Sequence, residues 1–178
     1  MTDRRMVLGI DPGLTITGFG IVEANATGRD VGALAMGTIR TKAREARANR
    51  LAQIAERVGE LIEEHRPDEV AIEQHFVAEN VRSAMAIGEA RAAVMVAAAS
   101  RGLPVYEYAP TAVKEAVAGH GGAPKEQVQQ MVMAQLNLKE EPSPFDVSDA
   151  LAVALTRLSD AHLEAMTAQA QTQAGGRS

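Results

Sequence analysis

The sequence contains no cysteine. Disulfide frameworks, zinc-thiolate sites and a cysteine nucleophile are therefore excluded, and any bound metal must have oxygen or histidine ligands. The longest uninterrupted apolar run, residues 92–99, is far too short to span a membrane. The apolar stretch near the amino terminus breaks at Asp11 and Pro12, which does not fit a signal peptide. We expect a soluble protein of the cytoplasm.

Aromatic side chains and positive charge are also scarce. The chain has two tyrosines, three phenylalanines and a net charge of −5, whereas nucleic-acid-binding domains are often strongly basic. The charge is unevenly distributed, because residues 39–50 hold five basic side chains and a single acid. These cations are Arg40, Lys42, Arg44, Arg47 and Arg50. The segment fits either a local basic surface or a solvated helix face of mixed charge.

The length of 178 residues predicts one domain with a sizeable core. We place this domain at residues 1–160. The remaining residues, 161–178, are small and polar without a strong apolar period, which predicts a disordered tail.

The pattern of apolar residues predicts an α/β fold. Three β-rich runs open the chain and predict an antiparallel meander. Strands and helices then alternate, which predicts a mixed sheet with helices on its faces. The expected strands are residues 6–11, 16–24, 31–41, 69–73 and 104–108, and the expected helices are residues 44–65, 80–100, 111–118, 125–137 and 145–160.

Carboxylates occur at the ends of several predicted elements. Asp11 and Glu73 each end a strand, while Asp146 and Asp149 lie at the start of the last helix. Because functional sites gather at strand ends in open α/β sheets, these four side chains could converge. Carboxylate oxygens suit Mg²⁺ or Mn²⁺, and two such ions about 3.5–4 Å apart can clamp the oxygens exchanged at a phosphodiester. The pattern favours a metal-dependent nuclease.

Each acid also has a simpler interpretation. Ser143, Pro144 and Asp146 read as an N-cap, a first-turn proline and a capping box. Asp149 lies a turn deeper, beyond reach of the first-turn N–H groups, and two carboxylates on one face repel unless a cation lies between them. For Asp11 a solvated turn residue, and for Glu73 a charged strand end, remain open alternatives.

Four segments together resemble the RuvC family of Holliday junction resolvases. They are GIDPGLTITGFGIV (9–22), AIEQHFVAENVRSAMAIGEARA (71–92), YAPTAVKEAVAGHGGAPKEQVQQMV (108–132) and DVSDALAVAL (146–155). The resemblance implies a ribonuclease H-like fold, a mixed five-stranded sheet flanked by helices. It also implies a homodimer that makes paired nicks in four-way junction DNA, and a branch-migration motor of the RuvA and RuvB type as partner.

The resemblance assigns roles to individual residues. The acidic tetrad of the family matches Asp11, Glu73, Asp146 and Asp149, which implies that all four are catalytic metal ligands for Mg²⁺ or Mn²⁺, with two ions per site. Phe76 matches an aromatic residue beside the junction centre, and Lys114 and Lys125 match basic residues near DNA. From the residues alone, Phe76 fits equally well into a small core, and both lysines fit an exposed helix face.

Three other functions are weighed against this one. An actin-like or sugar-kinase ATPase shares the opening hairpin but needs a second phosphate loop, which this sequence lacks. A resolvase-like nuclease of structured RNA and a junction-binding module without catalysis remain alternatives. Among the histidines, His75 alone merits testing, because it follows Glu73 by two positions.

The helix at residues 80–100 is predicted to form a two-fold dimer interface. Its small and apolar side chains cover more faces than one sheet can bury, and two symmetric cuts require two related sites. Met95 is expected on its exposed apolar side.

Overall fold

The computed structural model describes residues 4–25, 27–28, 30–74 and 80–175, with side chains up to residue 172. His75 and Phe76 lie outside the described residues. The strands are β1 (Arg4–Asp11), β2 (Ile16–Asn25), β3 (Val31–Arg40), β4 (Glu69–Glu73) and β5 (Val105–Tyr108). The helices are α1 (Arg47–His65), α2 (Val81–Ala99), α3 (Pro110–Ala118), α4 (Lys125–Leu136) and α5 (Phe145–Gly175).

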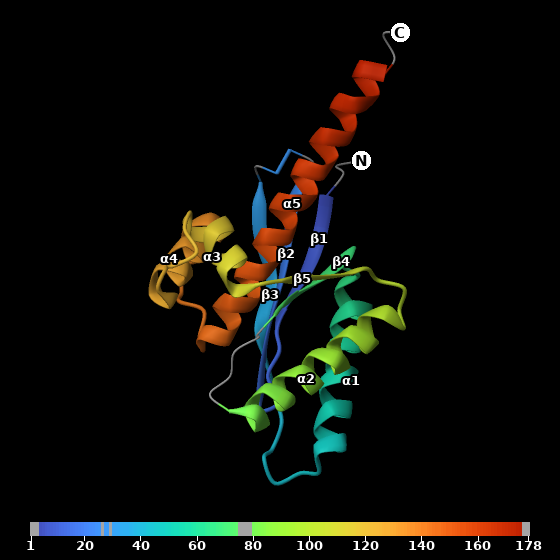
Figure 1. Cartoon of the computed structure of the whole chain (residues 1–178), viewed down its shortest axis with the longest axis vertical. Helices are drawn as coiled ribbons and strands as arrows, with labels where there is room; N and C mark the ends of the chain where they lie inside the picture. Colours follow the sequence, from blue (N-terminus) through green and yellow to red (C-terminus); the bar gives the residue numbers. More distant parts are fainter. Residues whose placement is uncertain (1–3, 26, 29, 75–79, 176–178) are drawn as a thin grey trace.

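The five strands form one mixed sheet in the order β3-β2-β1-β4-β5 (Figure 1). The pairs β1–β2 and β2–β3 are antiparallel, whereas β1–β4 and β4–β5 are parallel. The mixed sheet and the opening meander predicted from the sequence are therefore confirmed. Because β1 and β4 are neighbouring parallel strands, their carboxyl ends meet at the same end of the sheet.

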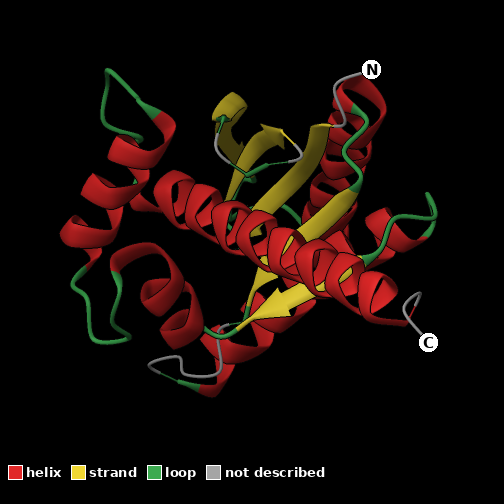
Figure 2. Cartoon of the chain, turned by 90° about the horizontal axis from the view of Figure 1, so that it is seen from above, coloured by secondary structure: helices red, strands yellow, loops and turns green. Residues whose placement is uncertain are grey.

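Helices cover both faces of the sheet (Figure 2). Alternate strand residues divide between the two layers, so that Val7 and Ala71 pack under the helices α3, α4 and α5. Leu8 and Ile72 point to the opposite layer, which holds α1 and α2. Successive side chains of a strand point to opposite faces of the sheet, so a strand that is covered on both faces buries apolar residues on each side.

Two glycines let α5 approach the sheet very closely. A Cβ atom built on Gly9 would lie 2.1 Å from the carbonyl oxygen of Ala150. One built on Gly18 would lie 1.9 Å from the carbonyl oxygen of Asp146. Gly18 pairs with Asp11 across the β1–β2 ladder. The backbone of α5 therefore rests on β1 and β2 at the end of the sheet where Asp11 lies.

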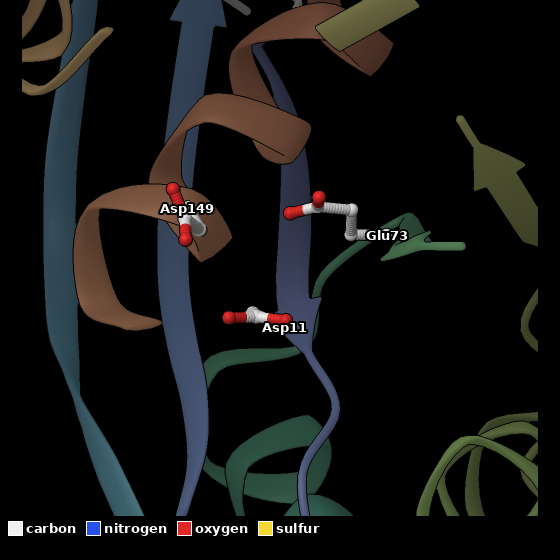
Figure 3. A group of neighbouring side chains, drawn as sticks. All are labelled: Asp11, Glu73 and Asp149. Atoms are coloured by element: carbon white, nitrogen blue, oxygen red, sulfur yellow. The ribbon is translucent and has the colours of Figure 1, made fainter. Parts of the chain in front are cut away.

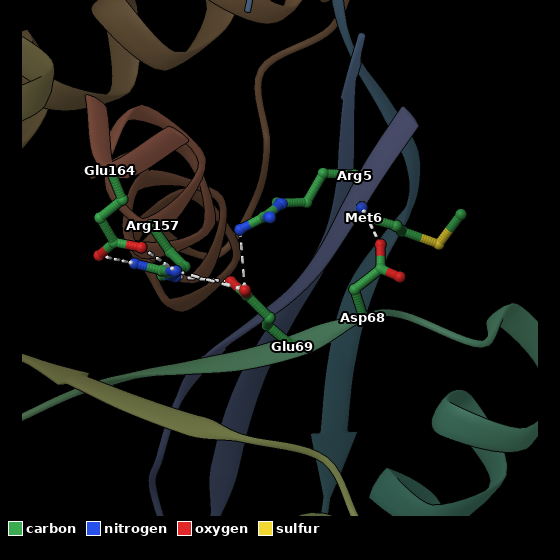
Figure 4. Close-up of polar contacts among 6 residues, drawn as sticks. All are labelled: Arg5, Met6, Asp68, Glu69, Arg157 and Glu164. Atoms are coloured by element: carbon green, nitrogen blue, oxygen red, sulfur yellow. Dashed lines mark hydrogen bonds and ion pairs between the residues drawn. The ribbon is translucent and has the colours of Figure 1, made fainter. Parts of the chain in front are cut away.

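A buried arginine ties α5 to the far end of β4 (Figure 4). Arg157 is 1% exposed and donates through Nε to Glu69 at 2.5 Å. Glu69 also accepts a hydrogen bond from Arg5 at 3.0 Å, and Arg157 donates to Glu164 at 2.8 Å. The guanidinium stacks 3.7 Å from the centroid of the Tyr106 ring. Because the buried charge has these partners, it locks α5 to β1, β4 and β5 rather than destabilising the core.

The last helix differs from the sequence prediction at both ends. The helix begins at Phe145, so Pro144 precedes the helix rather than occupying its first turn. The helix then runs to Gly175, although the sequence predicts a disordered tail from residue 161. Residues 163–172 are exposed, so this extension makes little use of an apolar face. Its alanines, glutamines and glutamate are strong helix formers, which a search for apolar periodicity overlooks.

Two further predictions are corrected by burial. Arg50, which the sequence places in the basic surface, is only 8% exposed and lies under the turns next to β1 and β3. Met95 is half-buried and packs on the core of α1 and α2, so it is not on the exposed side of α2. In both cases a residue's own chemistry does not reveal which side of its helix faces the sheet. No helix among the described residues is long and apolar enough to cross a membrane.

Candidate active site

Three carboxylates converge where β1 and β4 end (Figure 3). Asp11 is the last residue of β1 and Glu73 the last residue of β4, and the preceding residues Ile10 and Ile72 are paired in the sheet. Asp149 reaches the same space from the first turns of α5. One oxygen from each of the three acids lies within 4.8 Å of the others. The predicted convergence is therefore present for these three residues.

Burial and mutual repulsion raise the pKa values of two carboxyl groups in this cluster. Burial, reinforced by the charges of Glu73, Asp149 and Asp146, raises the pKa of Asp11 well above its ordinary value. Burial and the charge of Asp149 raise the pKa of Glu73 to about 7. Carboxylates held this close would carry less repulsion with a cation between them. The cluster thus has the charge and geometry of a cation site.

Asp146 lies at the edge of this cluster. Its backbone rests on Gly18, and its charge contributes to the raised pKa of Asp11. Its carboxylate is half-buried and is not in the group of three acids whose oxygens lie within 4.8 Å. Asp149, one turn further along α5, takes that place. The structure therefore brings three of the four predicted acids into direct proximity and leaves the fourth beside them.

Two lysines line the pocket next to the acids. This pocket has a volume of about 140 Å³. It is lined by Glu73, Pro110, Val113, Lys114, Lys125, Val128 and Asp149. Lys125 Nζ lies 2.7 Å from Asp149 Oδ2. Burial lowers the pKa of Lys125, but its hydrogen bond to Asp149 and the charges of Asp11 and Glu73 more than offset that, so the pKa is raised. Lys125 is therefore a stable cation, and both predicted lysines lie at the acidic cluster.

The residues present fit divalent metal ions with hard oxygen ligands. The cluster offers several carboxylate oxygens without sulfur, as Mg²⁺ and Mn²⁺ prefer. The sequence reasoning did not single out Gly9 and Gly18, which allow α5 to bring its aspartates to β1. The glycines within strongly apolar strands were the available signal, since such a residue often marks close backbone approach.

The mixed five-stranded sheet flanked by helices places the chain in the ribonuclease H-like fold class, and its neighbouring strands β1 and β4 end in a carboxylate cluster. The family model described as crossover junction endodeoxyribonuclease RuvC matches residues 7–157. The chain belongs to this family, whose nucleases are metal-dependent.

Similar proteins agree with this assignment. The crossover junction endodeoxyribonuclease RuvC of Moorella thermoacetica is 51% identical over 154 residues, covering 86% of this chain and 91% of that protein. The structure of Thermus thermophilus RuvC in complex with a Holliday junction substrate is 41% identical, with a TM-score of 0.85, covering 90% of this chain and 96% of that chain. The yeast mitochondrial Holliday junction resolvase Ydc2 shares the fold at 12% identity, with a TM-score of 0.65, covering 89% of this chain and 81% of that chain.

Proposed function

We propose that this chain resolves four-way DNA junctions by hydrolysing one phosphodiester bond in each of two opposing strands. The buried carboxylate cluster carries this proposal, because it supplies the ligand set for metal-dependent phosphodiester hydrolysis. A solved relative that is 41% identical is a RuvC in complex with a Holliday junction substrate, which supports the choice of substrate.

The acids hold the metal in this proposal. Asp11, Glu73 and Asp149 bind two Mg²⁺ or Mn²⁺ ions, and Asp146 completes the ligand set from the first turn of α5. When bound, the ions provide an activated water and neutralise charge on the attacked phosphate. The acids must be ionised to act as ligands, so Asp11 and Glu73, whose pKa values are raised, would have to be deprotonated to hold an ion.

The lysines and an aromatic residue position the DNA. Lys114 and Lys125 lie beside Glu73 and Asp149, where their ammonium groups can hold the phosphate next to the cleaved bond. Phe76 follows Glu73 by three positions and is proposed to stack on a base at the junction centre, where such stacking contributes roughly 1–3 kcal/mol.

Two copies of the chain act together in this proposal. Helix α2 buries one apolar face against the sheet, yet Val81, Met85 and Val96 on its other side are 77%, 57% and 66% exposed. Gly88 and Ala92 lie on the same exposed stripe, so a second helix can approach closely there. A second copy is the occupant that the reaction itself requires, because two symmetric cuts need two sites related by a two-fold axis. A branch-migration motor of the RuvA and RuvB type is the further proposed partner, and the cytoplasm is the proposed location.

The proposal is tested with synthetic junctions. Immobile and mobile four-way junctions, a linear duplex of the same sequence and a structured RNA are each incubated with the protein in Mg²⁺, Mn²⁺ or a chelator. Symmetric nicks in the four-way junctions that require a metal are the expected result. Preferential cleavage of the RNA would support an RNA-processing nuclease instead, and metal-independent binding without nicks would indicate a junction-binding module.

A further inference from the structure

The segment of residues 40–47, here called the basic segment, presents cations that have no ion-pair partner in the part of the chain that the structure describes. Arg40, Lys42 and Arg44 are exposed. Among the described residues, none of the three forms an ion pair. Some exposed arginines elsewhere, such as Arg57 and Arg101, pair with a carboxylate, whereas the basic segment holds three unpaired cations within five positions. The basic segment therefore keeps most of its positive charge available to a ligand.

The remaining charges of the segment strengthen this contrast. Its acid, Glu45, accepts a hydrogen bond from Gln53 at 2.6 Å, which directs the carboxylate toward α1. Arg47 pairs with Glu89 of α2 at 3.1 Å. Helix α1 starts at Arg47 with no acid in its first turn, so its dipole adds to the positive potential of the segment. The chain as a whole has a net charge of −5, so this positive charge is confined to a local part of the surface.

Buried hydrogen bonds fix the segment to the turn after β1. Thr41 donates through its backbone N–H to Thr15 at 3.1 Å and through its hydroxyl to the carbonyl oxygen of Leu14 at 2.5 Å. Arg50 donates to the hydroxyl of Thr41 at 2.8 Å and to that of Thr15 at 2.9 Å. A buried guanidinium is costly unless its N–H groups are satisfied, and here they join α1, β3 and the β1–β2 turn. The exposed cations are therefore attached to a backbone that buried hydrogen bonds hold in place.

This hydrogen-bonded part of the basic segment lies at the end of the sheet where Asp11 lies. The turn held by Thr41 and Arg50 follows Asp11 directly in sequence. Arg40 ends β3 opposite Ile16, the first residue of β2. In Figure 1 the connection between β3 and α1 extends past the end of the sheet where β1 finishes. Lys114 and Lys125 approach the acids from α3 and α4, so the basic segment is a separate source of positive charge.

We infer that the basic segment is a second phosphate-binding surface, which holds the backbone of a duplex arm adjoining the cleaved strand. The inference rests on the proposed junction substrate and extends it from the cut to the arms. Lysine and arginine side chains that contact phosphates fix the register of a protein on DNA without reading its sequence. Because the segment is tied to the strand of Asp11, an arm held there keeps a defined position relative to the acids.

The test compares two charge-matched double variants. Lys42→Gln with Arg44→Gln removes two charges from the basic segment, and Arg57→Gln with Arg66→Gln removes two from exposed positions further along α1 or just beyond it. Junction binding is measured in a chelator over a range of salt concentrations. Because two copies bind one junction, four phosphate contacts are lost, so the slope of log affinity against log salt should fall by about 3.6 for the first variant, at about 0.9 per lost contact, and should not change for the control.

Arm length provides a second readout. Junctions whose arms are cut to a few base pairs should bind the first variant and the unmodified protein equally well, whereas long-armed junctions should separate them. Equal salt slopes for the first variant and the control would overturn the inference, as would a defect that persists on short arms. Nicking by the unmodified protein is scored independently, so its absence would contradict the proposed function rather than the phosphate surface. All substituted side chains are exposed, so thermal unfolding should be unaffected.

Discussion

Asp146 and Asp149 lie one helical turn apart but have different surroundings. The carboxylate of Asp149 joins those of Asp11 and Glu73, while that of Asp146 stays outside the group and acts on Asp11 through its charge. Asp146 nevertheless lies over Gly18, the cross-strand neighbour of Asp11, so its position suits the proposed role of completing the ligand set. Substitution of Asp146 can therefore distinguish a role at the start of the helix from a role as a metal ligand.

Amide substitutions make that separation. Asn in place of Asp11, Asp146 or Asp149, and Gln in place of Glu73, should each lower nicking at least about a hundred-fold, because metal ions contribute several kcal/mol to such a transition state. Junction binding should be kept or strengthened, since repulsion toward phosphates falls. The measurement is single-turnover cleavage alongside binding in chelator. If Asp146 served only at the helix start, Asp146→Asn would be nearly silent, since asparagine serves similarly there.

Glu73 should make the metal-free protein less stable as pH rises. Its pKa is raised from 4.5 to about 7, so between these values the folded state binds more protons than the unfolded state. Stability therefore falls as pH rises through this window, by up to about 3 kcal/mol at 1.36 kcal/mol per unit. Chelator-treated Glu73→Gln should lose this part of the pH dependence and exceed the unmodified protein in stability at pH 8. Denaturant unfolding at pH 5 and pH 8 checks this, and parallel pH profiles for the two proteins would contradict it.

At the scale of elements, the approach of α5 to β1 and β2 sets the geometry of the acids. Gly18→Ala would place a methyl group against the carbonyl oxygen of Asp146, and neither backbone can yield easily. We expect a loss of about 1–3 kcal/mol or more in stability and a displaced α5 start, with a large loss of nicking. Gly32→Ala in β3 is the matched control, because a Cβ there meets nothing within 4 Å. Thermal unfolding and nicking are measured for both variants, and a stable, active Gly18→Ala would show that this contact is dispensable.

The sequence predicted regular elements better than the contacts between them. Strands such as residues 69–73 were predictable because alternation and turn residues act locally, and β4 has these bounds. The close approach at Gly18, the burial of Arg50 and the inward side of Met95 depend on which face of each element meets the sheet. That information is distributed over residues far apart in sequence. The extension of α5 was missed for another reason, because its composition favours a helix without an apolar stripe.

In the candidate site, too, the positions of residues on their elements were predicted better than the contacts between elements. Asp11 and Glu73 could be predicted as neighbours once both were assigned to strand ends, and Asp149 was a candidate from its place near the start of the last helix. The resemblance to the RuvC family added the two lysines. The ion pair between Lys125 and Asp149 follows from the packing of α4 against α5, which neither periodicity nor motif encodes. It places a cation on the Asp149 carboxylate, so Lys125 stabilises the negative charge of Asp149 in the metal-free protein.

At the scale of the whole molecule, α2 has a second apolar face that remains exposed in a single copy of the chain. Ala90, Val94 and Ala98 are fully buried on the sheet side, yet Val81, Met85 and Val96 remain more than half exposed on the other. Apolar surface of this kind, lying along a whole helix, marks an interaction site. The proposed reaction implies that a second copy of the chain covers this face, because paired cuts in a junction need two acidic clusters and the described residues of each copy form one.

Val96→Glu should therefore weaken the dimer. A charge introduced into an apolar interface is desolvated on association without a partner, so the dimer should dissociate at micromolar concentration. Folding should be retained, because Val96 is 66% exposed within one copy. Gln171→Glu, at an exposed residue near the end of α5, is the control for added charge. Light scattering gives the mass of each protein, and junction nicking should change from paired cuts to single, uncoordinated nicks in Val96→Glu. A monomeric mass for the unmodified protein, or an intact Val96→Glu dimer, would remove α2 from the interface.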